Sequence, residues 1–381
     1  MLLEYGAKNF LSFNEGIQVS FRLNSNCPES ISKGKNYTNV LCVKGANGSG
    51  KTNVLKILNF LDEFCCNSFS KKPDEEIECK SFFNNNEPID FYIEFAIDKI
   101  EFRYELTLTK KNVLNETLFK KNKRTTKVLE RKNNKIEYNS SEYDDVKIIK
   151  LRSNASIIST ANQYEIKILD PIYKFFKSII TNIKFNFSNE NIGNALISDI
   201  SEIYYENQEI FNFSKDMIYK SDLGINNIEI IKNEDENNKS RYFPVFSYSL
   251  NNKNYFLTFA EQSSGTKSLF NQLWVYKNAL TDGGILVLDE FDINLHSHLL
   301  PLLINLFDNE SINKNDTQII FTTHNTEIMD SLSKYRLFLV NKENNESFGY
   351  RVDEISGDMI RNERPISPIY NEGKIGGIPK I

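Results

Sequence analysis

The feature that most constrains this chain is a glycine-rich stretch that directly follows a short apolar run. The run is Val40–Val43, and the stretch Gly45–Thr52 reads Gly-Ala-Asn-Gly-Ser-Gly-Lys-Thr, which matches the pattern G-x-x-x-x-G-K-[ST]. Glycines let the backbone turn tightly and point its N–H groups at phosphate oxygens, and a helix that begins near Lys51 presents the positive end of its dipole to the same anion. The pattern therefore predicts a strand, a phosphate-binding loop and a helix, in that order.

In such a loop the lysine and the following hydroxyl residue have separate tasks. Lys51 supplies a point charge for the β- and γ-phosphates of a nucleoside triphosphate, and the Thr52 hydroxyl is placed to join the coordination shell of Mg²⁺. The other residues that we expect at the nucleotide lie beside these two: Asn47, Gly48, Ser49, Gly50 and Asn53.

Two further apolar runs, far downstream, end in polar residues. Ile285–Leu288 leads into Asp289 and Glu290, and Gln318–Thr323 leads into His324. A carboxylate at the end of a buried strand can orient Mg²⁺ through water, and a neighbouring carboxylate can polarise the water that attacks a γ-phosphate. This Walker B pattern predicts Asp289 as a metal-site residue and Glu290 as the general base.

A Ser-x-Gly turn lies between these two halves of the site. Ser263-Ser264-Gly265-Thr266 stands at the expected start of an apolar helix, where backbone N–H groups can bind an anion. Such turns also cap helices in many proteins, so the position of this one relative to the other motifs makes it informative. The order GANGSGKT, SSGT, ILVLDE, DINLH, TTH resembles an ABC-type ATPase head of the SMC, RecF and OLD group.

This resemblance implies a fold and an assembly. The implied fold is α/β, an ABC-type P-loop ATPase head with an antiparallel β accessory lobe and an inserted helical lobe. It also implies that ATP and Mg²⁺ are bound and that ATP is hydrolysed slowly. Ser263 and Gly265 would belong to the signature, Asp292–His296 to the D-loop, and His324 would sense the γ-phosphate. In this group the phosphate loop of one head pairs with the signature of another, so a homodimer with ATP between its heads is implied.

Both ends of the chain extend the resemblance. Lys8–Phe13 resembles the opening of these heads, and Tyr370–Pro379 resembles the tail of stand-alone bacterial AAA-family ATPases of the RloA/AbiL-like phage-resistance type. The tail implies a sensor or regulator of an anti-phage, abortive-infection system that controls a separately encoded effector, a nuclease or another toxin. No Toprim-like acidic cluster follows His324 and no heptads are sustained, so we expect neither the nuclease half of OLD proteins nor a long coiled-coil arm.

Three positions depart from the family pattern or leave it open. The signature reads Ser-Ser-Gly-Thr where transporters have Ser-Gly-Gly-Gln, and Ile375 stands where the tail usually has Tyr. The Q-loop glutamine is not obvious from its surroundings. Gln163 is the best candidate, and we expect it at the metal together with Thr52 and Asp289.

A different function for the same head also remains open, that of a RecF- or SMC-like DNA-repair ATPase that clamps DNA. A basic stretch supports it, although the same stretch is also typical of a solvated hairpin. The net charge of −5 gives no general attraction to nucleic acid. The basic residues of this stretch are Lys110, Lys111, Lys120, Lys121, Lys123, Arg124, Lys127, Arg131, Lys132 and Lys135.

The histidines allow another chemistry. His296 and His298, together with Asp289, Glu290 and His324, could form a metal-hydrolase cluster, since these are the side chains that bind zinc and manganese. We regard the nucleotide site as the better interpretation, because the phosphate loop is complete.

Composition places the chain among soluble globular proteins. It has 381 residues, of which 40% are hydrophobic and 25% charged. No apolar run approaches the roughly 20 residues of a membrane helix, and no basic segment followed by an apolar one stands at the start, so we expect a cytoplasmic protein without membrane contact. The five cysteines show no paired C-x-x-C spacing, which predicts reduced thiols.

The pattern along the chain predicts four parts. These are residues 1–80, the N-terminal part of the ATPase core with the phosphate loop; 81–150, a β accessory lobe; 151–241, a helical lobe; and 242–381, the C-terminal part of the core with the signature, Walker B, D-loop and His324. The predicted elements are a hairpin over residues 2–21, a helix from Lys51 to near Cys66, antiparallel strands over 88–140, helices over 155–215, a surface loop at 233–238 within the polar stretch 226–241, and strands at 242–249 and 255–259.

Overall fold

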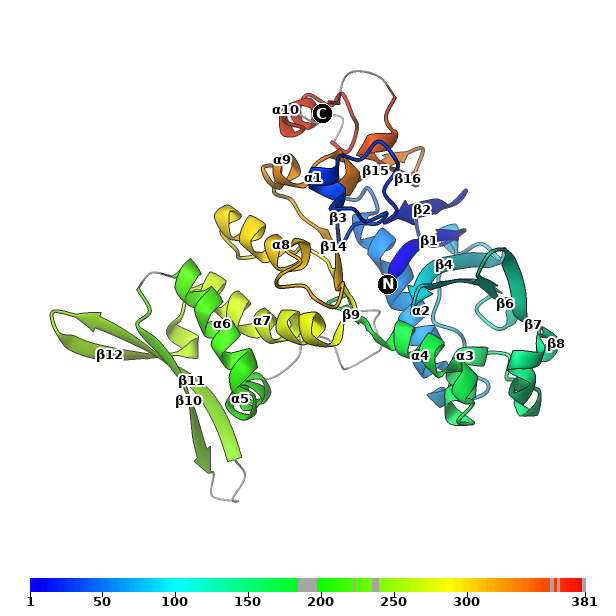
Figure 1. Ribbon diagram of the computed structural model, residues 1–381, viewed down its shortest axis with the longest axis horizontal. Coiled ribbons are helices and arrows are strands. Elements are labelled where there is room, and N and C mark those ends of the chain that lie inside the picture. The colour runs from blue at the N-terminus through cyan, green and yellow to red at the C-terminus, as the bar shows by residue number, and fades with distance from the viewer. Residues whose placement is uncertain (184–196, 223, 235–239, 357–359, 362–363, 379–381) are drawn as a thin grey trace. The chain divides into compact units, whose positions relative to one another are not determined.

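The computed structural model describes residues 1–183, 197–222, 224–234, 240–356, 360–361 and 364–378 (Figure 1). The chain forms two compact units. The first comprises Met1–Phe185, Gly284–Asp289 and Thr317–Ile381, and the second comprises Asn186–Gly283 and Glu290–Asp316. The four-part division expected from the sequence stays a prediction.

A seven-stranded antiparallel sheet forms one layer of the first unit. Its strands lie in the order β2-β1-β4-β5-β6-β7-β8. Alternate side chains of β4, such as Phe91, Ile93 and Phe95, are buried, which is the period-two pattern of a sheet with one face on the core. The bounds are β1 Leu2–Lys8, β2 Ile17–Ser20, β4 Ile89–Ile97, β5 Ile100–Leu108, β6 Val113–Lys121, β7 Thr125–Lys132 and β8 Lys135–Asn139.

A second sheet of the same unit has six strands in the order β16-β15-β3-β14-β13-β9. All of its neighbouring strands are parallel except the β15–β16 hairpin. The runs of β13 and β14 are buried throughout, as expected for parallel strands covered on both faces. The bounds are β3 Val40–Gly45, β9 Ile179–Thr181, β13 Ile285–Leu288, β14 Gln318–Thr322, β15 Leu337–Glu343 and β16 Glu346–Arg351.

Helix α2, Lys51–Asn67, packs against strands of both sheets and fills the core between them (Figure 1). Its Phe60 ring stacks on Phe91 of β4 at a centroid distance of 4.6 Å. The Gln318 side chain joins the sheets directly, because it accepts from Leu2 N at 2.6 Å and donates to Leu2 O at 2.9 Å. The remaining helices of this unit are α1 Glu29–Ser32, α3 Ile157–Gln163, α4 Asp170–Lys177, α9 Ile328–Leu332 and α10 Ser367–Asn371.

The second unit combines helices with a three-stranded antiparallel sheet of order β10-β11-β12. Tyr204 of α5 anchors α7, since its hydroxyl donates to Phe270 O at 2.7 Å and the two rings lie 4.8 Å apart. The bounds are α5 Ile197–Glu206, α6 Gln208–Ser221, β10 Asn227–Glu234, β11 Ser240–Leu250, β12 Lys253–Thr258, α7 Ser264–Asp282 and α8 Leu300–Asp308.

Most of the elements predicted from the sequence are confirmed. The N-terminal hairpin is β1 and β2, the helix after the phosphate loop ends at Asn67, and the strands over 88–140 are antiparallel. All five cysteines are free thiols, as predicted: Cys27, Cys42, Cys65, Cys66 and Cys79. No helix among the described residues combines the length and the apolar character that crossing a bilayer requires.

Two predictions of local structure are wrong. Ile179 and Ile180 were expected to be helical, but they lie in strand β9, because Ile179–Thr181 pairs in parallel with Ile285–Val287 of β13. The surface loop was expected to begin at residue 233, but Asn233 and Glu234 are the last two residues of strand β10, Asn227–Glu234, where they pair with Arg241 and Ser240 of β11. Residues 235–238 of the predicted surface loop lie outside the described residues.

Candidate functional site

The candidate site lies at the edge of the six-stranded sheet where its parallel strands end. Four of them run side by side in the order β3, β14, β13, β9. They end in the phosphate loop, in Thr322, in Asp289 and in Asn182, respectively. In open α/β sheets, ligands bind at this carboxyl edge. The pairing therefore gathers groups from four distant parts of the sequence at one place.

Glycines at two positions of the phosphate loop are required by backbone geometry. Gly48 and Gly50 have φ values of 74° and 109°, a region that L side chains rarely adopt. A Cβ atom at Gly50 would also lie 2.7 Å from the Ser347 hydroxyl and 2.9 Å from the Ser12 hydroxyl. Gly50 directly precedes the first residue of α2, so the loop directs the N–H groups of this helix end toward an anion.

Two polar side chains of the loop, Lys51 and Ser49, are suited to bind phosphate oxygens. The buried Lys51 ammonium donates to Gly45 O at 2.9 Å and to Ala46 O at 3.1 Å. The Ser49 hydroxyl oxygen is buried and makes no hydrogen bond to the described residues, although the Ser49 carbonyl accepts from Ser347 Oγ at 2.6 Å. Phosphate oxygens would satisfy the Ser49 hydroxyl and would compete for the lysine, so this loop fits a polyphosphate.

Asp289 connects the loop to the neighbouring strands. Its Oδ2 accepts from the Thr52 hydroxyl at 2.8 Å, and its Oδ1 accepts from the Thr322 hydroxyl at 2.6 Å. A hydroxyl and a carboxylate this close, beside a phosphate-binding loop, are the oxygen donors that Mg²⁺ takes together with substrate phosphates. Thr52 and Asp289 therefore fit the magnesium site that the sequence predicted.

Asn182 is a site residue that sequence reasoning missed. Its side-chain amide donates to Asp289 O at 2.9 Å, and its Oδ1 accepts from Asp289 N at 2.8 Å. This pair of bonds fixes the backbone of Asp289, the carboxylate that the sequence predicts at a metal. The position of Asn182 directly after β9 would have indicated a site residue at a strand end. The sequence analysis did not use it, because Ile179–Thr181 falls in the region predicted to be helical.

The structure does not bring Gln163 to this site. Gln163 is the exposed last residue of α3, and the preceding turn of α3 bonds to the far end of α2, where Ser159 Oγ donates to Cys66 O at 3.1 Å. Cys66 lies about 20 Å along the α2 axis from Thr52 at 1.5 Å per residue. The assignment of Gln163 as a metal ligand therefore has no geometric support.

Glu290 and His324 both lie on exposed turns directly after strands. Glu290 has a φ of 51°, which is uncommon for a residue with a side chain and is typical of functional sites, and its carbonyl accepts from Ile293 N at 2.9 Å. His324 follows the strand between the phosphate loop and Asp289. Its turn is tied to β3 by the buried Lys44, whose ammonium donates to Asn325 O at 3.1 Å.

The Ser-x-Gly turn is the start of α7, in the second unit. Ser263 caps this helix, since its hydroxyl oxygen accepts from Thr266 N at 3.1 Å, and the Thr266 hydroxyl in turn lies 3.1 Å from Asp222 Oδ2. A Cβ atom at Gly265 would lie 3.0 Å from Asn294 O of the predicted D-loop, so a side chain there would press on that loop. Ser263 is exposed at the N-terminus of a 19-residue helix, where an anion is favoured.

The metal-hydrolase alternative finds no support. Within the described part of the chain, no group of three or more His, Cys, Asp and Glu side chains is arranged to hold a metal ion. The rings of His296 and His298 stack on each other, with centroids 5.2 Å apart.

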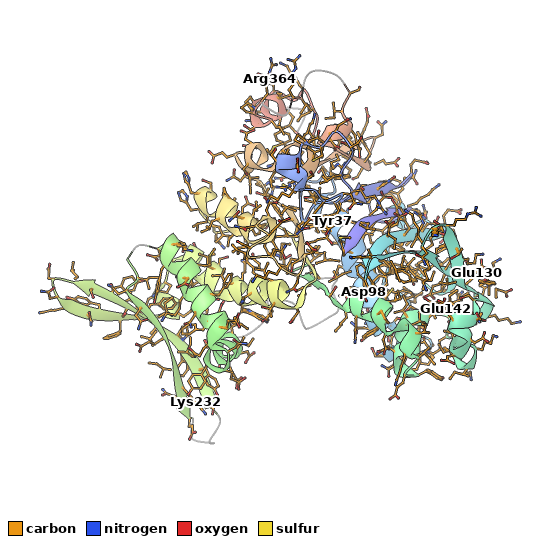
Figure 2. The ribbon with its side chains drawn as sticks, viewed as in Figure 1. Tyr37, Asp98, Glu130, Glu142, Lys232 and Arg364 are labelled. Atoms are coloured by element: carbon orange, nitrogen blue, oxygen red, sulfur yellow. The ribbon has the colours of Figure 1, made fainter. Side chains whose placement is uncertain are left out.

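The basic stretch is largely balanced by nearby carboxylates. Lys120 pairs with Glu142 at 2.8 Å, Lys121 pairs with Glu101 at 2.9 Å, and Lys127 pairs with Glu130 at 2.9 Å. Figure 2 labels Glu130 of β7 and Glu142, which lies in the short helical segment Ser141–Ile148 after β8. Arg131 is fully buried and pairs with Glu116, so it belongs to the core and not to a surface.

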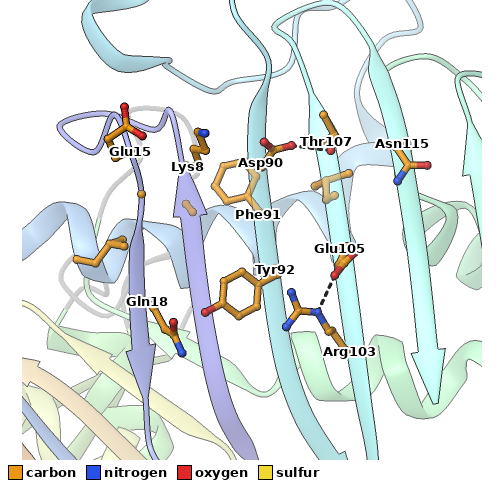
Figure 3. Close-up of a pocket in the computed structure, with 14 residues that line it drawn as sticks. Lys8, Glu15, Gln18, Asp90, Phe91, Tyr92, Arg103, Glu105, Thr107 and Asn115 are labelled. Atoms are coloured by element: carbon orange, nitrogen blue, oxygen red, sulfur yellow. Dashed lines mark hydrogen bonds and ion pairs between the residues drawn. The ribbon is translucent and has the colours of Figure 1, made fainter. Parts of the chain in front are cut away.

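A hollow of about 520 Å³ lies on the seven-stranded sheet, over β1, β2, β4 and β5 (Figure 3). Its charged groups bond mainly to other protein groups: Arg103 pairs with Glu105 and Glu94, and Asp90 accepts from the Thr107 hydroxyl. Because the arginine is already matched by two carboxylates, this hollow is a weaker candidate for a phosphate ligand than the glycine-rich loop.

Comparisons with known proteins identify a family and similar folds. A family model described as "AAA domain, putative AbiEii toxin, Type IV TA system" matches residues 40–330, which is more than half of the chain. Among solved structures, the chain is similar to an SMC head bound to the C-winged helix domain of ScpA, with 14% identity, a TM-score of 0.51, and coverage of 93% of this chain and 99% of that one. It is also similar to the SMC head domain from Thermotoga maritima, with 15% identity, a TM-score of 0.47, and coverage of 92% and 98%.

No curated protein matches the chain. The family match covers the phosphate loop, Asp289 and His324, and the SMC-head likeness extends over nearly all of the fold. The chain therefore belongs to this AAA-domain family, and its fold is that of an ABC-type ATPase head of the SMC and RecF group.

Proposed function

We propose that this protein binds Mg-ATP at Gly45–Thr52 and hydrolyses it slowly. The single observation that carries the proposal is the bond between Thr52 and Asp289, because it joins the phosphate loop to a carboxylate on a separate strand. Lys51 would leave the loop carbonyls to neutralise the β- and γ-phosphates. When bound, Mg²⁺ would neutralise charge that develops on the transferred phosphoryl group, with Thr52 and Asp289 as its protein ligands.

Glu290 is the proposed general base. It follows Asp289 directly and is exposed, so its carboxylate can accept a proton from an attacking water. His324 lies in the turn that follows β14, the strand between β3 and β13, a position suited to contact with the γ-phosphate. Asn182 would hold the backbone of Asp289 without itself contacting the substrate.

The proposed active unit is a homodimer in which ATP lies between the heads. Ser263 and Gly265, at the exposed start of α7, would meet the γ-phosphate held by the Lys51 loop of the other copy. In this arrangement each nucleotide completes a contact between two chains, so ATP binding favours the dimer and hydrolysis releases it.

We further propose that the ATP-controlled dimer regulates a separately encoded effector, a nuclease or toxin, in an anti-phage system. The family description, which names a toxin of a toxin–antitoxin system, supports this role by analogy. The alternative of a DNA-repair clamp draws on the basic stretch, but pairing of Lys120, Lys121 and Lys127 with carboxylates weakens it.

Replacement of the proposed base tests the ATPase. Glu290→Gln should bind Mg-ATP, lose hydrolysis by a factor of 100 or more, on the order expected for a general base, and accumulate as a dimer in light scattering. Glu29→Gln, which changes an exposed glutamate of α1, serves as the control and should behave as the wild type. Hydrolysis by Glu290→Gln at the wild-type rate would refute the assignment of the base.

A further inference from the structure

A second hollow lies beside the phosphate loop and has no role in the function proposed so far. Its volume is about 320 Å³, within the range of small-ligand sites. It is lined by Leu11, Ser12, Asn53, Lys80, Ser81, Phe82, Phe83, Asn84, Lys342 and Asn345. Among these described lining residues none is acidic and two are lysines, so the hollow suits a ligand with a negative end.

The hollow begins where a nucleoside would leave the phosphate loop. Lys51 and Thr52 are the groups for the β- and γ-phosphates, and the next residue, Asn53, is part of the hollow's wall. The Asn53 side chain donates to Ser12 Oγ at 2.8 Å, which joins the first turn of α2 to the N-terminal segment within the wall of the hollow. A triphosphate on the loop therefore has this hollow beside the end that carries its sugar and base.

Phe83, in the wall of this hollow, has an exposed apolar ring and an unfavourable backbone conformation. Its side chain is 72% exposed, and its φ is 48°, a left-handed conformation that is unfavourable for a bulky residue. Its ring contacts Phe82 edge to face at 4.6 Å. Backbone strain is concentrated at active sites and ligand clamps, and planar bases stack on aromatic side chains.

The turn that carries Phe83 is held firmly by Asn9. The Asn9 side chain accepts from Phe82 N at 3.2 Å and donates to Pro88 O at 2.9 Å. The backbone of Leu11 adds a bond from its N–H to Lys80 O at 3.0 Å. The ring is therefore presented by a fixed scaffold, which lowers the entropy that stacking would cost.

We propose that this hollow receives the ribose and base of the nucleotide, with Phe83 stacked on the base and Lys80 and Lys342 near the α-phosphate. The proposal rests on the proposed ATPase function and adds the residue that recognises the nucleoside. According to this proposal, the phosphate loop and Phe83 contribute separately to the binding energy, because the loop binds the phosphates and Phe83 binds the base.

The test compares Mg-ATP with Mg-tripolyphosphate, which has the phosphates without the nucleoside, by titration calorimetry on the full chain. In Phe83→Ala the Kd for Mg-ATP should rise about tenfold or more, whereas the Kd for tripolyphosphate should stay within twofold. Phe83→Trp should keep the wild-type affinity, and ATP but not tripolyphosphate should quench its added fluorescence over that of Trp274. Phe256→Ala, which removes a ring that is 66% exposed in β12, is the matched control and should change neither Kd.

The outcomes separate the two proposals. If the wild type binds both ligands but Phe83→Ala leaves both affinities unchanged, the base site is refuted and the phosphate site stands. Equal losses for the two ligands would also refute stacking, because tripolyphosphate has no base. If the wild type binds neither ligand, the proposed function itself fails, and the base site with it.

Discussion

The Thr52 hydroxyl bonds to the carboxylate of Asp289 at 2.8 Å, although the two residues are 237 positions apart in the sequence. The bond is possible because β14 lies between β3 and β13, so that the phosphate loop and the Walker B carboxylate end at the same sheet edge. Thr322, at the end of β14, occupies the other oxygen of the carboxylate at 2.6 Å. The parallel sheet thus brings together the groups of the proposed metal site.

The first prediction concerns Asn182, which fixes the backbone of Asp289 through two hydrogen bonds. Asn182→Ala should lower kcat roughly tenfold to a hundredfold and change KM little, because the loop that binds the phosphates is untouched while the metal-site carboxylate is less well held. Steady-state kinetics over a range of Mg²⁺ concentrations checks this, and added Mg²⁺ should partly rescue the variant.

Asn139→Ala is the control, since Asn139 bonds to Asp144 on the surface of the β8 region. A loss of kcat that is the same at every Mg²⁺ concentration would contradict a positioning role at the metal.

A second prediction concerns the buried ion pair of the seven-stranded sheet. Arg131 and Glu116 are both inaccessible to solvent and 3.1 Å apart, and burial raises the pKa of Glu116 while Arg131 opposes that rise. Arg131→Met should lower the free energy of unfolding by about 3–5 kcal/mol, because it leaves a carboxylate buried without its partner. Urea unfolding measures the loss.

Lys121→Met provides the comparison, since its partner Glu101 is partly exposed, and it should cost less than about 1 kcal/mol. The double variant Arg131→Met with Glu116→Gln should recover part of the stability. Equal losses of unfolding free energy for Arg131→Met and Lys121→Met would show that burial does not make the Arg131–Glu116 pair more important for stability than an exposed pair.

A third prediction follows from Asp62 of α2. Burial raises the pKa of Asp62 from 3.8 to about 7, against a smaller lowering by Cys66 and Lys177. Since the folded-state pKa is the higher one, the folded state holds this proton more tightly, and the resulting stability is present at low pH and is lost as pH rises toward 7. Asp62→Asn should match the wild type near pH 4 and exceed its free energy of unfolding by roughly 1–3 kcal/mol at pH 8.

Urea unfolding of both proteins at several pH values between 4 and 8 gives the comparison. Asp74→Asn, at an exposed position, should leave the pH dependence as it is in the wild type. An Asp62→Asn variant with the same pH profile as the wild type would show that Asp62 is ionised in the folded protein throughout this range.

The fourth prediction distinguishes the effector regulator from the DNA clamp. Because Lys120, Lys121 and Lys127 are paired with carboxylates, we expect weak DNA binding whose affinity falls little when Lys120, Lys121, Lys123 and Arg124 are neutralised together. Fluorescence anisotropy with duplex DNA at two salt concentrations measures this. Tight binding that falls steeply with salt and disappears in the neutralised variant would favour the clamp.

The sequence alone could predict the loop and the strand end that the structure brings together at the candidate site. Gly48, Gly50 and Lys51 belong to one contiguous loop, and Asp289 ends an apolar run, so pattern and spacing were enough. Asn182 could not be found this way, because its role depends on the pairing of the short strand β9 with β13, more than a hundred residues away. Gln163 was chosen by residue type alone, and the packing of α3 on the far end of α2 removes it from the site.

The fold shows the same division between local and long-range determinants. The alternation over 88–140 fixes antiparallel strands, whereas the joining of β1 and β2 to these strands in one sheet rests on the register of Tyr5 with Ile93. The charge pattern along the sequence also left two interpretations of the basic stretch open, a solvated hairpin and a surface that binds phosphates. The lysines of residues 110–135 form a run in one dimension, but the sheet places Glu101 opposite Lys121 on the neighbouring strand.

The central claim is that ATP is hydrolysed at a site shared by two copies of the chain, and complementation between two inactive variants tests it. Lys51→Ala removes the phosphate-loop lysine, and Ser263→Arg blocks the exposed start of α7. Each variant alone should be inactive, with a circular dichroism spectrum like that of the wild type. An equal mixture should recover about a quarter of wild-type ATPase activity, because half of the dimers are mixed and each mixed dimer has one intact site. A mixture as inactive as its folded components, or an Ser263→Arg variant that is fully active alone, would contradict the shared site.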